Sequence, residues 1–247
     1  VVIVKGEINM KITLKAYAKI NLMLDILSRL DNGYHDLFMI MQSVSLHDII
    51  TVEKTDTEDI KITCDVPSIP TDEKNIAYKA AKAFFDYTGI ENTGVAIDIQ
   101  KNIPHAAGLA GGSTDGAAVI VALGELFGVS LKEKDIIIIG SRVGADVPFC
   151  ALGGTMLAQY TGTVLSHLPD LKLPYIIITK PMQDVSTAEA YAAFDSAERV
   201  RHLDKNGMLQ AVISGDYGKV YEKVGNVFEQ FIDVTERVLI KDIMRKY

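Results

Sequence analysis

One stretch of small residues has the composition of a loop that binds an anion. Residues 101–115 read Lys-Asn-Ile-Pro-His-Ala-Ala-Gly-Leu-Ala-Gly-Gly-Ser-Thr-Asp, and Ser113, Thr114 and Asp115 are residue types that cap helices. Glycine accepts positive φ and close backbone approach, and unpaired N–H groups at a helix N-terminus attract phosphate. The stretch therefore favours a phosphate-binding loop, with a glycine-rich turn that only packs a helix on a sheet as the alternative.

The spacing of these glycines excludes two common nucleotide-binding motifs. No Lys-Ser or Lys-Thr pair follows Gly112, as a Walker A loop requires. The Gly-x-Gly-x-x-Gly spacing of a dinucleotide-binding fold is also missing. A phosphate bound by this stretch would therefore be held by a different kind of loop.

Three polar residues elsewhere in the chain could act on a bound phosphate. Lys19 and Asn21 share one face of a predicted strand, about 7 Å apart, because alternate strand residues point the same way. Asp146 lies between a predicted helix end and Pro148, whose ring restricts the backbone. A solvated strand face is the alternative for Lys19, and an ordinary helix cap is the alternative for Asp146.

The hydrophobic pattern predicts the elements that position these residues. Apolar residues at the even positions of 10–26 indicate two strands with a bend near Ala16 and Ala18. A strand at 95–99 precedes the small-residue stretch, and a helix follows it over 117–127. Further predicted elements are strands at 48–54, 60–64 and 175–179, and helices at 75–87, from a Ser130 capping box to Val143, from a Ser186 capping box, and from 199 onward.

The overall composition indicates a globular protein with an α+β fold. The 247 residues are 48% hydrophobic and carry a net charge of −7, which argues against a protein that coats nucleic acid. Cys64 and Cys150 lie in apolar stretches, so we expect buried free thiols and a cytoplasmic location. No apolar run is long enough to span a membrane, so we expect no membrane partner.

The composition changes near 166–174, which predicts one domain at 10–165 and a second at 166–247. Residues 1–9 begin without methionine and precede Met10. We interpret them as an expression remnant or an upstream extension, with a genuine edge strand as the alternative.

Four motifs together resemble the GHMP kinase superfamily of small-molecule kinases. Residues 104–115 are similar to its phosphate loop, with Ala110, Thr114 and Gly116 where Gly, Ser and Ala are usual. The match narrows to the members that phosphorylate a cytidine-diphosphate-linked methylerythritol for non-mevalonate isoprenoid synthesis. The motifs that carry this resemblance are Lys19-Ile20-Asn21-Leu22, Gly33-Tyr34-His35, Gly108 to Asp115, and Gly144-Ala145-Asp146-Val147-Pro148.

The resemblance implies a two-domain GHMP kinase fold. Its N-terminal domain is a ribosomal-protein-like α/β domain that binds ATP, and its C-terminal domain is ferredoxin-like. The family's third glycine-rich motif, Gly-x-Gly, has no match after Thr187. We therefore expect the C-terminal domain of the given sequence to be truncated or incomplete.

The resemblance also implies the activity, which is transfer of phosphate from ATP to the 2-hydroxyl of the methylerythritol unit. Asp146 would be the base beside that hydroxyl, and Lys19 would keep Asp146 ionised and stabilise charge on the moving phosphate. No cluster of metal ligands is visible in the sequence. Mg²⁺ is expected with ATP, and Ser113 or Thr114 could supply one hydroxyl.

By the same resemblance, the nucleotide would contact Asn75, Ile76, Lys101, Pro104, Ala107, Gly108, Leu109, Ala110, Gly111, Gly112, Ser113 and Thr114. The substrate would contact Asn21, Tyr34, His35, Thr187 and Tyr191. Tyr34 and Tyr191 are expected on the two faces of the cytosine base, with packing into the core as the alternative for each. A mevalonate- or homoserine-type kinase and a non-catalytic ligand sensor are the alternative functions. We expect a monomer or homodimer without nucleic-acid partners.

Overall fold

The structure is a computed structural model that describes residues 11–173, 175–183 and 185–246. The sequence interpretation of residues 1–9, and the proposed start at Met10, lie outside these described residues. Among the described helices, none has the length and apolar character needed to cross a bilayer.

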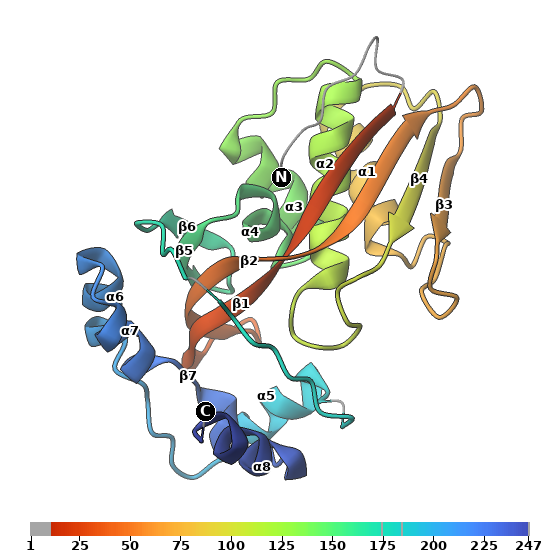
Figure 1. The fold of residues 1–247 in the computed structure, drawn as a ribbon. Coiled ribbons are helices and arrows are strands. Elements are labelled where there is room, and N and C mark those ends of the chain that lie inside the picture. The colour runs from red at the N-terminus through yellow and green to blue at the C-terminus, as the bar shows by residue number, and fades with distance from the viewer. Residues whose placement is uncertain (1–10, 174, 184, 247) are drawn as a thin grey trace.

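A mixed β-sheet forms the centre of the molecule (Figure 1). Its middle is an antiparallel hairpin of the two longest strands, β1 and β2. One half of β2 pairs with β4, which pairs in parallel with β3, and the other half pairs with β5. The strands are β1 (Lys11–Arg29), β2 (His35–Lys54), β3 (Ile60–Cys64), β4 (Val95–Gln100), β5 (Thr155–Tyr160), β6 (Val164–His167) and β7 (Gly225–Asn226).

The apolar alternation at 10–26 forms one strand, so the prediction of two strands with a bend was wrong. β1 is continuous, but its pairing with β2 shifts register between Tyr17 and Lys19, at the predicted position of the bend, and again between Asn21 and Met23. Such bulges bend a strand and increase its twist. These irregularities change which face each side chain occupies, and the side chain of Lys19 is turned into the protein interior. The irregular part of β1 is therefore the part that carries the candidate lysine.

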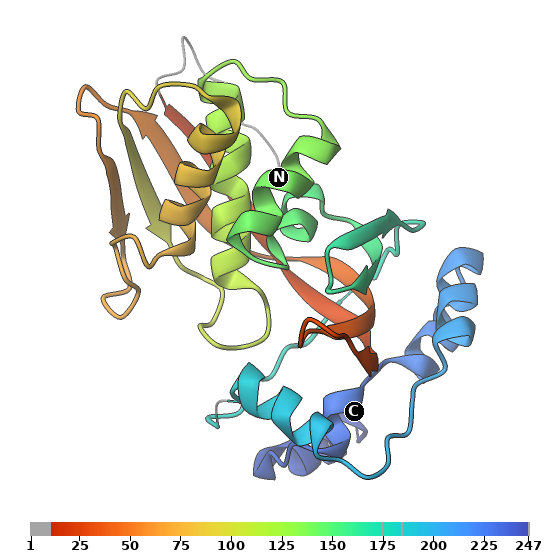
Figure 2. The ribbon, with the colours of Figure 1, turned by 180° about the vertical axis from the view of Figure 1, so that it is seen from behind.

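Four helices pack on one face of the sheet, as Figures 1 and 2 show. They are α1 (Ile76–Thr88), α2 (Gly111–Leu126), α3 (Glu133–Val143) and α4 (Val147–Leu152). The prediction of α1 is confirmed, with Asn75 as its N-cap and Gly89 at positive φ as its C-cap. A Cβ at Gly116 would lie 2.8 Å from Ile76 Cγ2, so a small residue is required where α1 crosses α2.

The chain after β6 folds mainly into helices beside the turn of the β1–β2 hairpin (Figure 1). These are α5 (Thr187–Asp195), α6 (Lys205–Ser214), α7 (Tyr217–Lys223), η1 (Val227–Gln230) and α8 (Thr235–Met244). The buried carboxylate of Asp25 on β1 holds this region, because it accepts the N–H of Leu203 and lies 3.2 Å from His202 Nδ1 and 3.7 Å from Lys205 Nζ. The predicted Ser186 cap of α5 is confirmed.

Two local predictions were wrong in this fold. Residues 175–179 form no strand, and Tyr175 and Ile177 are exposed, because an apolar run needs a neighbouring strand that the described residues do not supply. The helix predicted from Ser130 begins at Glu133, where the Asp135 carboxylate accepts the N–H of Lys132. The side chain of Asp135 therefore caps the N-terminus of α3, and Ser130 does not.

Candidate active site

The phosphate-loop candidate connects the end of β4 to the start of α2. Ala106, Gly108 and Ala110 adopt positive φ in this loop, so two of its three left-handed positions are alanines. Ala110 is the N-cap of α2, and no side chain caps the helix. Ser113, Thr114 and Asp115 lie inside the first turns of the helix, so the prediction that these residue types cap it was wrong.

The uncapped start of α2 has the geometry of an anion site. The first helical hydrogen bond, from Thr114 N–H to Ala110 O, leaves the N–H groups of Gly111, Gly112 and Ser113 without an intrahelical acceptor. These groups and the helix dipole favour negative charge at this point. A phosphate can replace the side-chain cap that this helix lacks.

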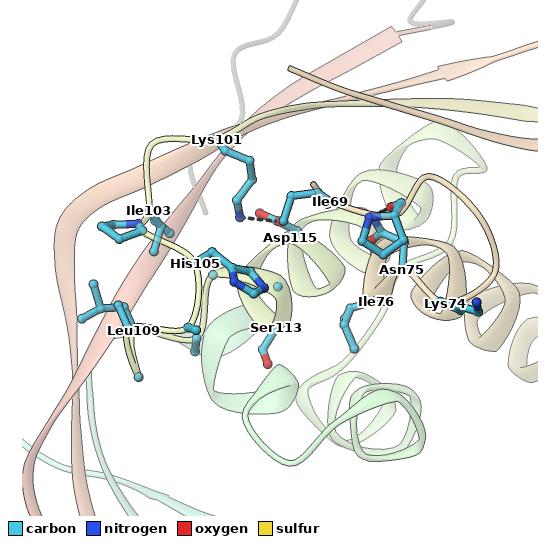
Figure 3. A pocket seen from close by; sticks show the side chains of 18 residues that line it. Ile69, Lys74, Asn75, Ile76, Lys101, Ile103, His105, Leu109, Ser113 and Asp115 are labelled. Atoms are coloured by element: carbon cyan, nitrogen blue, oxygen red, sulfur yellow. Dashed lines mark hydrogen bonds and ion pairs between the residues drawn. The ribbon is translucent and has the colours of Figure 1, made fainter. Parts of the chain in front are cut away.

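A cavity of about 350 Å³ opens against this loop and the start of α1. Figure 3 shows Asn75 and Ile76 on one side of it and His105, Leu109 and Ser113 on the other. Eleven of the twelve residues expected at the nucleotide line the cavity; these are Asn75, Ile76, Lys101, Pro104, Ala107, Gly108, Leu109, Ala110, Gly111, Gly112 and Ser113. The lining residues that sequence reasoning missed are Ile69, Pro70, Lys74, Ile103, His105, Ala106 and Asp115.

Two of the residues expected to bind the nucleotide, Thr114 and Asn75, have polar side chains that form hydrogen bonds within the protein. The Thr114 hydroxyl is buried and donates to Tyr17 O at 2.8 Å, which joins α2 to β1. The Asn75 side chain accepts the N–H of Ala77 and donates to Pro70 O at 2.6 Å. Thr114 therefore fixes the helix, and Asn75 shapes the cavity wall.

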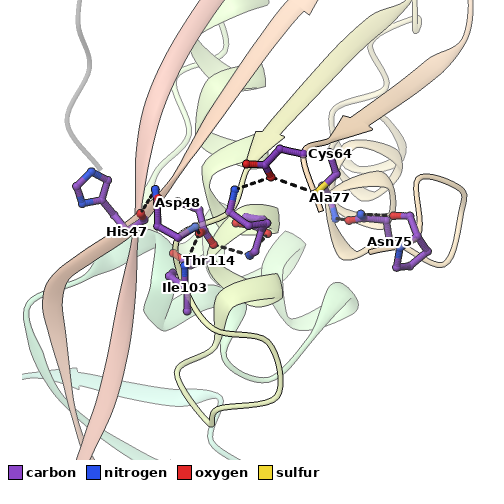
Figure 4. A network of polar contacts seen from close by, with 12 residues as sticks. His47, Asp48, Cys64, Asn75, Ala77, Ile103 and Thr114 are labelled. Carbon is purple, nitrogen blue, oxygen red and sulfur yellow. Dashed lines mark hydrogen bonds and ion pairs between the residues drawn. The ribbon is translucent and has the colours of Figure 1, made fainter. Parts of the chain in front are cut away.

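The ammonium of Lys101 lies between two buried carboxylates. Figure 3 shows its contact with Asp115, and Figure 4 shows the polar network around Asp48. Lys101 Nζ contacts Asp48 Oδ2 and lies 2.8 Å from Asp115 Oδ2. Burial raises the pKa of Asp115 to about 7; Lys101 opposes this shift, and Asp48 adds to it. Burial works against the charge of Lys101, but the two carboxylates outweigh it and raise the pKa of the lysine.

The two predicted catalytic side chains form an ion pair. Lys19 Nζ lies 3.3 Å from Asp146 Oδ2 and 3.5 Å from Asn21 Oδ1. The Lys19 side chain is 7% exposed and that of Asp146 is 32% exposed, so the carboxylate is the more accessible partner. Asp146 occupies the N-cap position of α4 without capping it, which disfavours the ordinary-cap alternative.

This ion pair is tied directly to the phosphate-loop candidate. The backbone N–H of Lys19 donates to Leu109 O at 3.1 Å, and Leu109 lines the cavity. Strand β1 thus carries both the buried lysine and an attachment point of the loop. The arrangement brings a carboxylate, a cation and an uncapped helix N-terminus into one region.

His35 and Tyr191 meet where the β1–β2 hairpin contacts α5. Their rings stack with centroids 4.5 Å apart and an angle of 20°. His35 Nε2 lies 2.7 Å from Asp195 Oδ1, and Asp195 also pairs with Arg29 at 3.5 Å. Burial, followed by the negative charge of Asp146, raises the pKa of Tyr191. Asp195 was missed by sequence reasoning, because only the fold brings it to His35.

The remaining two predicted substrate residues are exposed. Tyr34 is 65% exposed in the hairpin turn, and the structure records no ring contact between it and Tyr191. Thr187 begins α5 and lines a second cavity of about 490 Å³. Residues 106–108 of the loop line both cavities, so the two cavities meet at the loop.

The sheet with its helical face and the β4–loop–α2 connection have the arrangement found in GHMP kinases. The GHMP kinases N terminal domain matches residues 75–154, which span α1, the loop and α4. The fold is similar to that of a Methanococcus jannaschii mevalonate kinase, with a TM-score of 0.65 at 16% identity over 95% of this chain and 84% of that one.

Closer relatives identify the family within this class. The chain is 44% identical over 237 residues to the 4-diphosphocytidyl-2-C-methyl-D-erythritol kinase of Caldicellulosiruptor saccharolyticus, covering 95% of this chain and 81% of the relative. It is 42% identical over 235 residues to the Clostridium perfringens kinase of the same name, covering 94% and 81%. A crystal structure of 4-(cytidine 5'-diphospho)-2C-methyl-D-erythritol kinase matches with a TM-score of 0.69 at 28% identity, covering 95% and 81%. The chain belongs to the 4-diphosphocytidyl-2-C-methyl-D-erythritol kinase family.

Proposed function

We propose that this protein transfers the γ-phosphate of ATP to the 2-hydroxyl of 4-diphosphocytidyl-2-C-methyl-D-erythritol. The observation that carries the proposal is the Lys19–Asp146 ion pair, held at 3.3 Å beside the uncapped start of α2. Phosphoryl transfer needs positioning and charge compensation more than covalent chemistry, and this arrangement offers both. The relatives described above are named as kinases of this substrate, which supports the proposal.

ATP would occupy the cavity at the loop, with phosphates against the N–H groups of Gly111, Gly112 and Ser113. Ser113 lines the cavity, whereas the Thr114 hydroxyl donates to Tyr17 O, so Ser113 would supply one hydroxyl to an Mg²⁺ ion held mainly by the phosphates. Mg²⁺ bound there would neutralise charge on the β- and γ-phosphates. Ser113 is therefore the better hydroxyl ligand of the two.

The accessible carboxylate of Asp146 would accept the proton of the substrate hydroxyl as its oxygen bonds to the γ-phosphorus. The bond from the γ-phosphorus to the ADP oxygen breaks in the same step. Lys19 would stabilise the charge on the transferred group and hold the Asp146 carboxylate beside the substrate hydroxyl. Asn21, 3.5 Å from Lys19, is positioned to orient both the lysine and the substrate hydroxyl.

The cytosine end of the substrate would bind where His35, Tyr191 and Tyr34 lie. Tyr191 presents an aromatic ring from α5, and His35 has a ring nitrogen beyond the one that contacts Asp195. The exposed Tyr34 ring is free to stack on a base once the base enters. Thr187 would contact the substrate from the second cavity.

The test is phosphate transfer from ATP to three acceptors at equal concentration: the cytidylated methylerythritol, mevalonate and homoserine. We expect turnover with the first and little with the other two; a preference for mevalonate or homoserine would overturn the substrate assignment. Asp146→Asn should lower kcat by about 10²–10⁴-fold without weakening ATP binding. Unchanged turnover in this variant would remove Asp146 from the proposed role.

A further inference from the structure

A buried cluster of three charged side chains lies at the base of the phosphate loop, and the chemistry above does not use it. Asp48 is 0% exposed and Asp115 is 4% exposed, and the Lys101 ammonium lies between them. Asp115 Oδ1 is also buried without a hydrogen-bond partner. Burying three charges is costly, so the cluster calls for a role that offsets this cost.

Asp48 fixes the beginning of the loop from strand β2. Its Oδ1 accepts the N–H groups of Asn102 and Ile103, while its Oδ2 accepts from Lys101 Nζ. The N–H of Lys101 donates to Asp65 Oδ1 at 3.0 Å. Every backbone N–H from 101 to 103 is therefore held by a carboxylate outside the loop.

Lys101 joins this beginning of the loop to the helix that follows it. Its Nζ donates to Asp115 Oδ2 at 2.8 Å, and this contact spans the loop and the first turn of α2. A Cβ at Gly111 would lie 3.2 Å from Lys101 Nζ and 3.2 Å from Ile103 Cγ2, so a glycine leaves room for the ammonium. Residues 104–106 and Gly108, between these fixed ends, are exposed.

We propose that Asp48, Lys101 and Asp115 form a clasp that positions the phosphate loop, and that the Lys101 ammonium acts on ATP through that loop rather than by binding a phosphate. An exposed loop loses much conformational entropy when it orders around a ligand, and closing its two ends in advance reduces that loss. The ammonium is unsuited to direct phosphate binding, because its side chain is 8% exposed and two carboxylates offset its charge. This inference rests on the ATP-dependent function proposed above.

Asp48→Asn gives the sharpest test, because Asp48 does not line the cavity and cannot act by touching ATP. The dissociation constant of a fluorescent ATP analogue should rise at least tenfold, while kcat at saturating ATP and the KM of the second substrate stay within twofold. Lys101→Met should weaken binding similarly, and the double variant should be little worse than either single one, because both break the same clasp.

Asp25→Asn is the matched control. Asp25 is equally buried and also pairs with basic side chains, but these lie in the C-terminal region away from the loop. It should lower thermal stability without changing affinity for the ATP analogue. If Asp48→Asn does not fold, Lys101→Arg replaces it, and recovery of affinity relative to Lys101→Met supports the clasp.

Unchanged or tighter binding in Asp48→Asn would overturn the clasp, since a freed Lys101 would then bind phosphate directly. In the replacement test, the clasp would also be overturned if Lys101→Arg bound the ATP analogue no more tightly than Lys101→Met. Equal loss of affinity in Asp25→Asn would also overturn it, because the effect would then be general destabilisation. Failure of the unmodified protein to bind the analogue would instead contradict the proposed ATP-dependent function.

Discussion

The nucleotide end of the proposed site is fixed by buried contacts, whereas the base end is assembled from two distant and partly exposed segments. At the nucleotide end, Thr114 and Lys19 attach the loop to β1, and Lys101 joins its two ends. At the base end, His35 contacts Asp195, which lies 160 residues further along the chain, and its ring contacts those of Tyr191 and Phe194.

This difference suggests that the nucleotide end aligns the phosphates and that the base end admits and releases the substrate. A fixed loop suits ATP, whose phosphates must be aligned with an attacking hydroxyl to a fraction of an ångström. The base-binding end joins the hairpin to α5 through contacts between side chains, and Tyr34 at this end is exposed, so it can open and close at lower cost. Substitutions at the nucleotide end should therefore alter ATP binding, catalysis or folding, and those at the base end should alter the KM of the cytidylated substrate.

After Asp146→Asn, the largest effect is expected from Lys19→Met. Loss of the cation beside Asp146 should lower kcat by about 10²–10³-fold, the usual range for one electrostatic contact to a transition state. Steady-state kinetics measure it, with Lys15→Met as the control, because Lys15 is exposed on the same strand. A kcat within a few-fold of the unmodified protein would show that the buried pair is structural.

The next effect concerns the pH dependence of stability at the nucleotide end. Burial raises the pKa of Asp115 to about 7, above its value of 3.8 in the unfolded chain, so the folded state holds the proton more tightly. Its stabilising contribution is complete below pH 3.8 and is lost as pH rises through 7, by about 2–3 kcal/mol between pH 5 and 7. Denaturant unfolding measures this loss.

Asp115→Asn should flatten that dependence, because the amide does not titrate. Lys101 and Asp48 contact Asp115, and the thiols of Cys64 and Cys150 lie within its electrostatic reach; all four remain in the variant. The difference between the two pH profiles therefore isolates Asp115. Identical slopes from pH 5 to 7 would place its pKa near the ordinary value.

At the base end, Tyr191→Ala should raise the KM of the cytidylated substrate about tenfold. A stacked base is worth about 1–3 kcal/mol by alanine substitution, and Tyr191 also supports the ring of His35. The KM of ATP should not change. Tyr221→Ala is the control, because Tyr221 is 55% exposed on α7. An increase in the KM of ATP instead would contradict the separation of the two ends.

The smallest effect is expected from Asp195→Asn, which weakens the contact that orients His35. A hydrogen bond of this kind contributes about 1 kcal/mol, or about fivefold in the KM of the cytidylated substrate. Asp242→Asn, an exposed partner of Arg245 on α8, is the control. A change in kcat rather than KM would mean that Asp195 acts on the chemical step.

The parts of the site that could be predicted from the sequence are those that depend on residues close together in the chain. Asn75 and Gly89 bound α1 as predicted, because caps depend on a few neighbouring residues. Lys19 and Asn21 share a face because strand geometry has a period of two. The small residues of 101–115 made a phosphate loop the favoured reading, and the cavity lies against them.

The sequence by itself determined the family, the phosphate loop, and the combination of a lysine and an aspartate as the proposed catalytic residues. These features depend on residue identity at fixed spacings. Tertiary structure alone decided that α2 begins at Gly111 without a cap, and that residues 175–179 form no strand. It also decided that Lys101, 53 residues from Asp48, belongs to a buried cluster. Burial and charge pairing between distant segments arise only when the sheet forms, so no local pattern records them.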